Sequence, residues 1–323
     1  MATALSGAFL IGVGLTGFAS PDAARANAVD AVAAIEKVAP AAVSEVARDS
    51  GDSGTSARME VGDGTTVSVP LDARAGLHLD APAAAPDITI GLPFADRATA
   101  ATGSQKAGVV VYDNNNGSST VPVVHRDGTI QISTVIENAG APTRYDYPID
   151  VPADAALVEA PDGTVAVVAP DGAPLAVFGA AWAKDADGNP VPTHYRVTGN
   201  TLTQVVEHGE RTVYPVVADP STGVYSYNCV LTNGSSYFMA PGSALTNCKG
   251  SYLKKYINGA MVKSVALAYN GGGSAVKVTG AGWCIASLAG VAALAWNPLT
   301  ATGAWLLGTA STLLGAYGSC YQL

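Results

Sequence analysis

The chain has 323 residues, of which 48% are hydrophobic, 13% charged and 7% aromatic, with a formal net charge of −9. This length allows about two domains, and the apolar share can form a buried core, which excludes a wholly disordered chain. Because phosphate neutralisation needs clustered lysine and arginine, the acidic balance also argues against a nucleic-acid partner.

The N-terminus has the pattern of an export signal. Leu5 to Phe18 form a 14-residue apolar run, which is too short to span a membrane and fits the central region of a signal peptide. Ala24-Arg25-Ala26 supplies the small-x-small pattern that a signal peptidase accepts. We therefore predict a signal peptide over residues 1–26, cleavage after Ala26, and an extracellular protein that is released or associated with the cell envelope. An ordinary N-terminal helix is the alternative.

Residues 27–86 are predicted to form an Ala/Pro-rich helix and linker. A short helix within residues 28–48 serves as a propeptide or spacer, because apolar residues recur at helical spacing before Pro40. These residues are Val29, Val32, Ile35 and Val38. Residues 49–56 and 70–87 have linker composition, and a small hairpin is predicted between them, with Met59 and Val61 facing Val67 and Val69 across Asp63-Gly64.

Residues 87–220 show strand and turn signals throughout. The candidate strands are residues 88–94, 108–112, 120–124, 129–136, 144–151, 155–159, 164–169, 174–178, 194–197, 202–208 and 211–217. Tight-turn pairs separate several of them: Asp127-Gly128, Asp162-Gly163, Asp171-Gly172, Asp187-Gly188 and Gly199-Asn200. Short strands at this spacing predict a mainly β fold, an antiparallel β-sandwich. Alternation predicts that Ile130 and Ile132 face the core while Gln131 and Ser133 face water.

Part of this region resembles a known module. The residues that carry the resemblance are AWAKDADGNPVPTHY at 181–195, GNTLTQVV at 199–206 and YPVVADP at 214–220. Together they are similar to a β-rich module that recurs in secreted proteins of actinobacteria, where different C-terminal segments follow the Tyr-Pro-Val-Val-Ala-Asp-Pro ending. The resemblance implies export and a carrier role, and it brings no catalytic residues with it.

The charges divide the chain at residue 220. Residues 221–323 contain five lysines and no arginine, aspartate or glutamate, whereas residues 1–220 hold twelve basic and all 26 acidic side chains. This division predicts a cationic, acid-free module over 221–323 that follows an acidic carrier.

All four cysteines lie in the cationic module. In an exported protein an even set of cysteines favours disulfides over a metal site, and no Cys-x-x-Cys pair is present. Three pairings are open, and the pairing of sequence neighbours is favoured: Cys229 with Cys248 and Cys284 with Cys320. Every histidine lies outside this module, so no metal and no cofactor are predicted.

The cationic module is predicted to be a small α+β unit. Tyr252 to Ile257 and Ala260 to Ala268 flank Asn258-Gly259, a strong hairpin signal, and Lys254, Lys255 and Lys263 would make its exposed edge cationic. Residues 278–323 have no charged side chain, and two apolar stretches separated by Asn297-Pro298 predict a helical hairpin over 284–320.

Small residues recur every four positions in the second predicted helix, as in helices that pack closely within lipid. A cationic ribbon beside an uncharged hairpin is also typical of membrane-active peptides. The alternative is a soluble, disulfide-bonded domain in which small residues serve ordinary packing. The predicted membrane or partner contacts are Lys254, Lys255, Lys263, Trp296, Ala304, Trp305, Gly308, Thr312 and Ala316.

Three functional hypotheses follow. The first is an exported nonenzymatic protein whose acidic β module carries a membrane-active, toxin- or bacteriocin-like module to an anionic membrane surface, with the helical hairpin also offering an oligomer contact. The second is a structural or adhesive envelope protein that binds a wall polymer or a protein partner. The third is a secreted hydrolase. No catalytic residue is predicted, because Gly51-Asp52-Ser53-Gly54, which copies a serine-protease motif, precedes every histidine in the chain.

Overall fold

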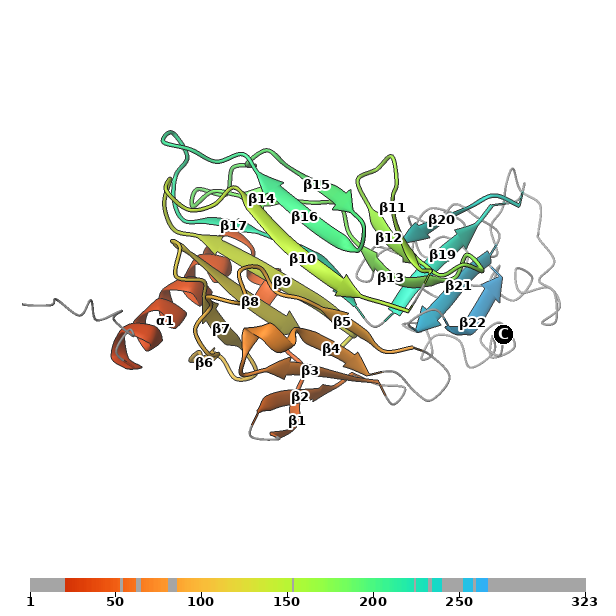
Figure 1. Cartoon of the computed structure of the whole chain (residues 1–323), viewed down its shortest axis with the longest axis horizontal. Coiled ribbons are helices and arrows are strands. Elements are labelled where there is room, and N and C mark those ends of the chain that lie inside the picture. The colour runs from red at the N-terminus through yellow and green to blue at the C-terminus, as the bar shows by residue number, and fades with distance from the viewer. Residues whose placement is uncertain are drawn as a thin grey trace, which may run out of the picture.

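The computed structural model describes residues 21–52, 55–61, 65–80, 86–152, 154–223, 225–231, 234–239, 252–257 and 260–266 (Figure 1). This part of the chain is mainly β, and every sheet in it is antiparallel. Two large sheets share one apolar core, which confirms the predicted β-sandwich.

The first sheet has eight strands and uses residues from both halves of the described chain. Their order across the sheet is β1 (Asp49–Asp52), β2 (Ser56–Glu60), β3 (Thr66–Pro70), β4 (Leu77–Asp80), β5 (Ile88–Ile90), β10 (Arg144–Asp150), β16 (Thr201–Val206) and β15 (Thr193–Thr198). A 3-10 turn, η2 (Ala73–Ala75), lies between β3 and β4.

The second sheet has β9 at its centre. Its path is β14 (Ala183–Lys184), β17 (Val216–Ala218), β9 (Thr129–Ile136), β8 (Ser118–Val124), β7 (Val110–Asp113) and β6 (Thr102–Gly103), and β18 (Ser221–Gly223) also pairs with β9. Thus β17 and β18 follow one another along the same edge of β9, with Asp219 and Pro220 between them.

Side chains from both sheets fill the space between them. The first sheet contributes Leu77, Leu79 and Tyr147, and the second contributes Ile130 and Ile132, all without exposed surface. Burial of large apolar side chains is the main favourable term in folding. The alternation predicted for Ile130 and Ile132 is therefore confirmed on this face of β9.

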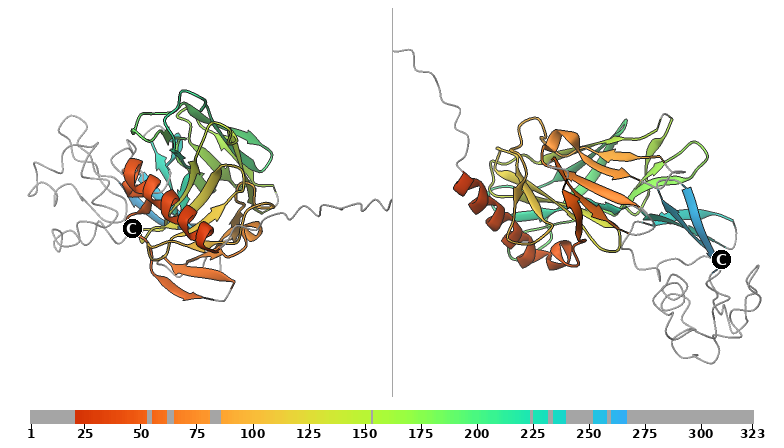
Figure 2. Two further views of the ribbon diagram at one scale, coloured as in Figure 1. Left: turned by 90° about the vertical axis from the view of Figure 1, so that its left-hand side faces the viewer. Right: turned by 90° about the horizontal axis from the view of Figure 1, so that it is seen from below.

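The opposite face of the second sheet is covered by α1 (Pro21–Val38), which lies along one side of the sandwich (Figure 2). Ile35 of α1 is fully buried and packs in one cluster with Val121, Val135 and Val217. The chain leaves α1 through η1 (Pro40–Val43), a 3-10 turn that belongs to the same cluster.

This helix explains why one prediction about β9 is wrong. Gln131 and Ser133 do not face water, since their exposed fractions are 7% and 0%. Alternation assigns them correctly to the face away from the sandwich core. That face is covered, however, by α1, by the residues that follow it and by the backbone at Pro220. Gln131 Nε2 donates to the Pro220 carbonyl oxygen at 3.3 Å.

Two small sheets extend the sandwich. The third sheet contains β11 (Ala156–Glu159), β12 (Val165–Val168) and β13 (Pro174–Phe178), and the fourth contains β20 (Ser236–Met239), β19 (Tyr225–Val230), β21 (Tyr252–Ile257) and β22 (Ala260–Ala266). β13 lies against β18 and β19, and Ser226 Oγ donates to the Pro174 carbonyl oxygen at 3.3 Å. The fourth sheet and α1 lie at opposite ends of the long axis (Figure 1).

The predicted turns and most predicted strands between residues 88 and 218 are confirmed. The glycines of the five turn pairs, Gly128, Gly163, Gly172, Gly188 and Gly199, all have positive φ angles. In four of these turns an aspartate side chain accepts a backbone hydrogen bond two residues ahead, for example Asp127 from the Thr129 nitrogen at 2.9 Å. The predicted hairpin is confirmed as the pairing of β2 with β3, in which Met59 lies opposite Val67, but Ala57 and not Val61 lies opposite Val69.

Residues 27–86 differ from the prediction of a helix and linker. Residues 49–52 and 77–80 form strands of the first sheet, and Leu77 and Leu79 belong to its core. Linker composition misleads here because Gly51 lies within β1 and Pro70 lies at the end of β3, where pairing with neighbouring strands outweighs local composition. The sandwich therefore begins with α1 and not near residue 87.

The boundary predicted at residue 220 does not separate two packing units. The Ile132 nitrogen donates to the Pro220 carbonyl oxygen at 2.8 Å, and β18 continues the pairing on β9. Tyr225 and Ile257 then join the main core. Charge divides the chain at residue 220, but the sheet runs through that point.

Candidate functional site

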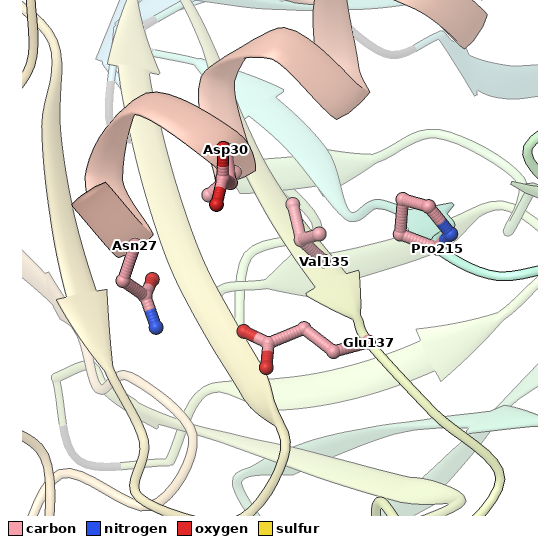
Figure 3. Close-up of a pocket in the computed structure, with 6 residues that line it drawn as sticks. Asn27, Asp30, Val135, Glu137 and Pro215 are labelled. Atoms are coloured by element: carbon pink, nitrogen blue, oxygen red, sulfur yellow. The ribbon is translucent and has the colours of Figure 1, made fainter. Parts of the chain in front are cut away.

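A cavity of about 390 Å³ lies between α1 and the second sheet. Figure 3 shows the carboxyl group of Glu137 directed from the end of β9 toward Asn27 on the helix, with Asp30 one turn farther along. The lining residues are Asn27, Asp30, Ala31, Val135, Glu137 and Pro215, and they include two carboxylates and no basic side chain.

Hydrogen bonds fix the first buried turn of α1 on this cavity. Asn27 Nδ2 donates to Asp113 Oδ2 at 3.2 Å, and the buried Ser119 hydroxyl lies 3.0 Å from Asn27 Oδ1. The same hydroxyl is 3.3 Å from Glu137 Oε1, so one proton serves two acceptors. Asn27 is thereby connected to β7, β8 and the end of β9.

The electrostatics of the cavity are acidic. Glu137 as a whole is an exposed residue, but its carboxyl end lies beneath the helix. This partial burial raises the pKa of the carboxyl group. The nearby charges of Asp113 and Asp30 raise this pKa further, while hydrogen bonds from Ser119 and Asn27 lower it. The cavity therefore favours a group that brings positive charge.

A second hollow is a groove of about 770 Å³ beside Trp182. Trp182 is half-buried against the α1 cluster, and Lys184 Nζ lies 6.0 Å from the centroid of its ring. Gln131 and Asp127 of the β8–β9 side also line the groove. An aromatic face with polar groups around it is a common setting for an uncharged polar ligand.

A buried carboxyl group lies next to the backbone of Trp182. Asp219 has no exposed surface, and its Oδ1 accepts from the Trp182 nitrogen at 2.9 Å. Gln204 Nε2 lies 3.4 Å from the same oxygen. Burial raises the pKa of Asp219 to about 8, against the effect of the hydrogen bonds from Trp182 and Gln204.

The predicted cationic edge differs from what the fourth sheet shows. β21, which contains Lys254 and Lys255, is an interior strand between β19 and β22. Neighbouring residues of a strand point to opposite faces, so these two lysines do not share a surface. Lys255 Nζ lies 3.5 Å from the centroid of the Tyr225 ring, and Lys263 is opposite Lys255 in the register of β22.

Of the four cysteines and the predicted helical hairpin, the structure describes only Cys229. Cys229 is fully buried in β19 and is not a free thiol. The other predicted residues, Cys248, Cys284, Cys320, Trp296, Ala304, Trp305, Gly308, Thr312 and Ala316, lie outside the described residues, as does the helical hairpin 284–320. No helix in the described part is long and apolar enough to cross a membrane.

Sequence reasoning did not single out the residues of the cavity. The helical spacing of Val32, Ile35 and Val38 was the available signal that α1 has a buried face. Nothing local marks Asp113 and Glu137 as neighbours, because they approach only through the pairing of β7, β8 and β9.

No protein-family model matches this chain, and no curated protein matches it. Functional inference therefore starts from the acidic cavity, the Trp182 groove and the charge division at residue 220. Within the described residues no group of three histidine, cysteine, aspartate or glutamate side chains is placed to hold a metal ion.

Proposed function

We propose that this is an exported, nonenzymatic protein whose β-sandwich presents the acid-free segment 221–323 to an anionic membrane surface. The charge division carries the proposal, since all 26 acidic side chains precede residue 221 and only lysines follow it among the charged residues. An anionic surface attracts such a segment, and an uncharged apolar sequence can then partition into lipid. The likeness of residues 181–220 to a carrier module of secreted actinobacterial proteins agrees with this role.

The first residues of segment 221–323 pack on the sandwich, which favours presentation of this segment by the intact protein over its release by proteolysis. β18 pairs with β9, and Tyr225 and Ile257 are part of the sandwich core. Asp219 and Pro220 are buried, so a protease has no access to the bond between them in the folded protein. The entire chain is therefore the active species in this proposal, and cleavage near Asp219-Pro220 is not needed.

Dye-filled vesicles test the proposal. The secreted, oxidised full-length protein at micromolar concentration should release dye from phosphatidylglycerol vesicles and leave phosphatidylcholine vesicles intact. Leu307→Lys, which places a charge in the uncharged stretch, should abolish release, since a charged side chain is costly in the hydrocarbon core. Leu71→Lys, at a position of the sandwich that is 40% exposed, is the matched control and should release dye like the wild type. No release by the wild type, or equal release by both variants, contradicts a membrane role.

The Trp182 groove favours a second candidate, an adhesive envelope protein that binds a wall polymer. Polysaccharides offer hydroxyl groups and apolar sugar faces, which suit a half-buried indole bordered by Gln131 and Asp127. Trp182→Ala should then reduce binding to isolated cell walls at least tenfold, while Val213→Ala, at an exposed site, should not. Thermal unfolding of both variants checks that they are folded. Unchanged wall binding by Trp182→Ala would exclude the groove.

The third hypothesis, a secreted hydrolase, requires acidic groups that converge in a polar cavity, and the cavity beneath α1 has such groups. However, the Asn27 amide and the Ser119 hydroxyl occupy the hydrogen-bonding positions between Asp113 and Glu137. These contacts hold the start of α1 on the sheet. We therefore do not propose hydrolysis at this cavity.

A further inference from the structure

The buried face of α1 begins at the predicted processing site. Residues 22–26 are exposed or half-buried, whereas Ala28, Ala31, Val32 and Ile35 are buried against the second sheet. Removal of the chain up to Ala26 would therefore take away no residue of the α1 cluster. What remains would start at Asn27, the residue whose side chain is bonded to Asp113 and lies within hydrogen-bonding distance of Ser119.

We propose that Asn27 is the first residue of the mature protein and that its new α-amino group binds in the acidic cavity beneath α1. The proposal rests on the export part of the proposed function, and it assigns the cavity an occupant from the chain itself. A signal peptidase would hydrolyse the Ala26–Asn27 peptide bond with one water molecule. Ala26 leaves as a carboxylate, and the Asn27 nitrogen takes up protons to become an ammonium group.

The position of the new amine follows from the contacts of Asn27. Its side chain is hydrogen-bonded to Asp113 on β7 and lies near Ser119 on β8, and Asn27 itself lines the cavity, so we expect the new amine to form at the cavity's edge. Figure 3 shows Glu137 directed toward Asn27 from the sheet, while Asp30 follows on the next turn of the helix. Two carboxylates, Asp30 and Glu137, thus line the cavity with Asn27, and a third, Asp113, is hydrogen-bonded to the Asn27 side chain.

The excess of acidic side chains around the cavity favours binding of a positively charged ammonium group. The carboxyls of Asp30 and Asp113 act on Glu137 as like charges, and no basic side chain lines the cavity to offset them. A cation at the N-terminus of a helix is otherwise unfavourable, because the helix dipole is positive there. The acidic side chains would overcome this cost and raise the pKa of the amine above its usual value of about 7.7–8.0.

An ammonium group needs fewer acidic side chains around it than a metal ion does. Among the described residues, no three histidine, cysteine, aspartate or glutamate side chains are grouped as metal ligands, and only two carboxylates line this cavity. An ammonium has three N–H donors and needs only one or two direct acceptors, with further acids acting over a longer distance. The Asn27 ammonium group could therefore bind without any rearrangement of the carboxylates in the cavity.

N-terminal sequencing of the secreted protein tests the processing step. The expected result is Asn27 as the first residue in the culture medium. A mature chain that begins elsewhere would overturn the proposal while leaving export intact. Absence of the protein from the medium would instead contradict the export on which the proposed function depends, so the two failures are distinguishable.

A second experiment tests the binding of the amine without export. The chain from Asn27 to Leu323 is prepared by cleaving it from an N-terminal ubiquitin fusion, which leaves a free Asn27 amine. Acylation of that amine at pH 7 by a limiting activated ester is followed by mass spectrometry of the N-terminal peptide. A pKa raised by about one leaves tenfold less free base, so acylation should be about tenfold faster in Glu137→Gln than in the wild type.

Glu159→Gln is the matched control, because Glu159 is an exposed glutamate on β11 outside the cavity. Its amine should react at the wild-type rate. Asp30→Asn should accelerate acylation in the same direction as Glu137→Gln, and circular dichroism of each variant checks that it is folded. Equal rates in the wild type, Glu137→Gln and Asp30→Asn would overturn the proposal.

Discussion

At the scale of single residues, Asp219 shows how the fold changes the chemistry of a side chain. Its carboxyl group is fully buried, and burial raises its pKa to about 8. Asp219 Oδ2 and Gln204 Oε1 have no hydrogen-bond partner, although Gln204 Nε2 lies 3.4 Å from Asp219 Oδ1. Removal from water disfavours the charged carboxylate, so the neutral acid fits this site better than the carboxylate.

The pH dependence of stability should report this proton. Because the pKa of Asp219 is about 8 when folded and near 3.8 when unfolded, the unfolded chain loses its proton first as the pH rises. The free energy of unfolding should therefore fall between about pH 4 and pH 8. Asp219→Asn should remove this part of the slope, measured by urea denaturation at several pH values. Asp154→Asn, at an exposed turn, is the control, and equal slopes in both variants would contradict a neutral Asp219.

The sequence could not reveal this burial. An Asp-Pro pair after a strand has the composition of a turn or a processing junction. Its true environment depends on Gln204 and Trp182, which meet Asp219 only when the two large sheets are assembled. The same holds for Asn27 and Glu137, which are separated by more than a hundred residues along the chain.

At the scale of elements, α1 is an integral part of the sandwich. Its helical spacing was predictable, but its role as a spacer was a wrong expectation, because the surface that it covers forms from β8, β9 and β17. Strand positions between residues 88 and 218 were predictable, since Asp-Gly turns and alternation are local signals. Sheet order was not, because pairing such as that of β5 with β10 joins distant segments.

Truncation of one helical side chain should show how much α1 contributes. Ile35 is fully buried, so Ile35→Ala removes its contacts and leaves a cavity, which should lower the free energy of unfolding by about 2–5 kcal/mol. Val29→Ala, on the same helix at a site that is 38% exposed, should change stability by less than about 0.5 kcal/mol. Urea denaturation measures both values, and similar losses for the two variants would show that α1 does not pack as described.

At the scale of the molecule, the charge division and the packing division do not coincide. Lysines alone carry the charge after residue 220, which the sequence shows directly. The strand β18 nevertheless completes the edge of β9, and the fourth sheet packs on β13. Composition therefore indicated two modules, whereas long-range strand pairing and packing join the described residues on both sides of residue 220.

Deletion of the C-terminal segment should consequently destabilise the sandwich. A chain that ends at Pro220 loses β18 and the core residues Tyr225 and Ile257, so its melting temperature should fall by several degrees relative to a chain that ends at Ala266. Differential scanning calorimetry of the two chains measures the difference. Equal melting temperatures would show that residues 1–220 form an independent domain.

The pairing of β17 and β18 on β9 also sets the order in which the molecule can be completed. During synthesis, β9 and α1 must wait for residues 216–223, and the core closes only when Ile257 has been made. Such distant contacts fold slowly, because a long loop must close before they form. Packing of the complete sandwich therefore has to follow synthesis of most of the described chain.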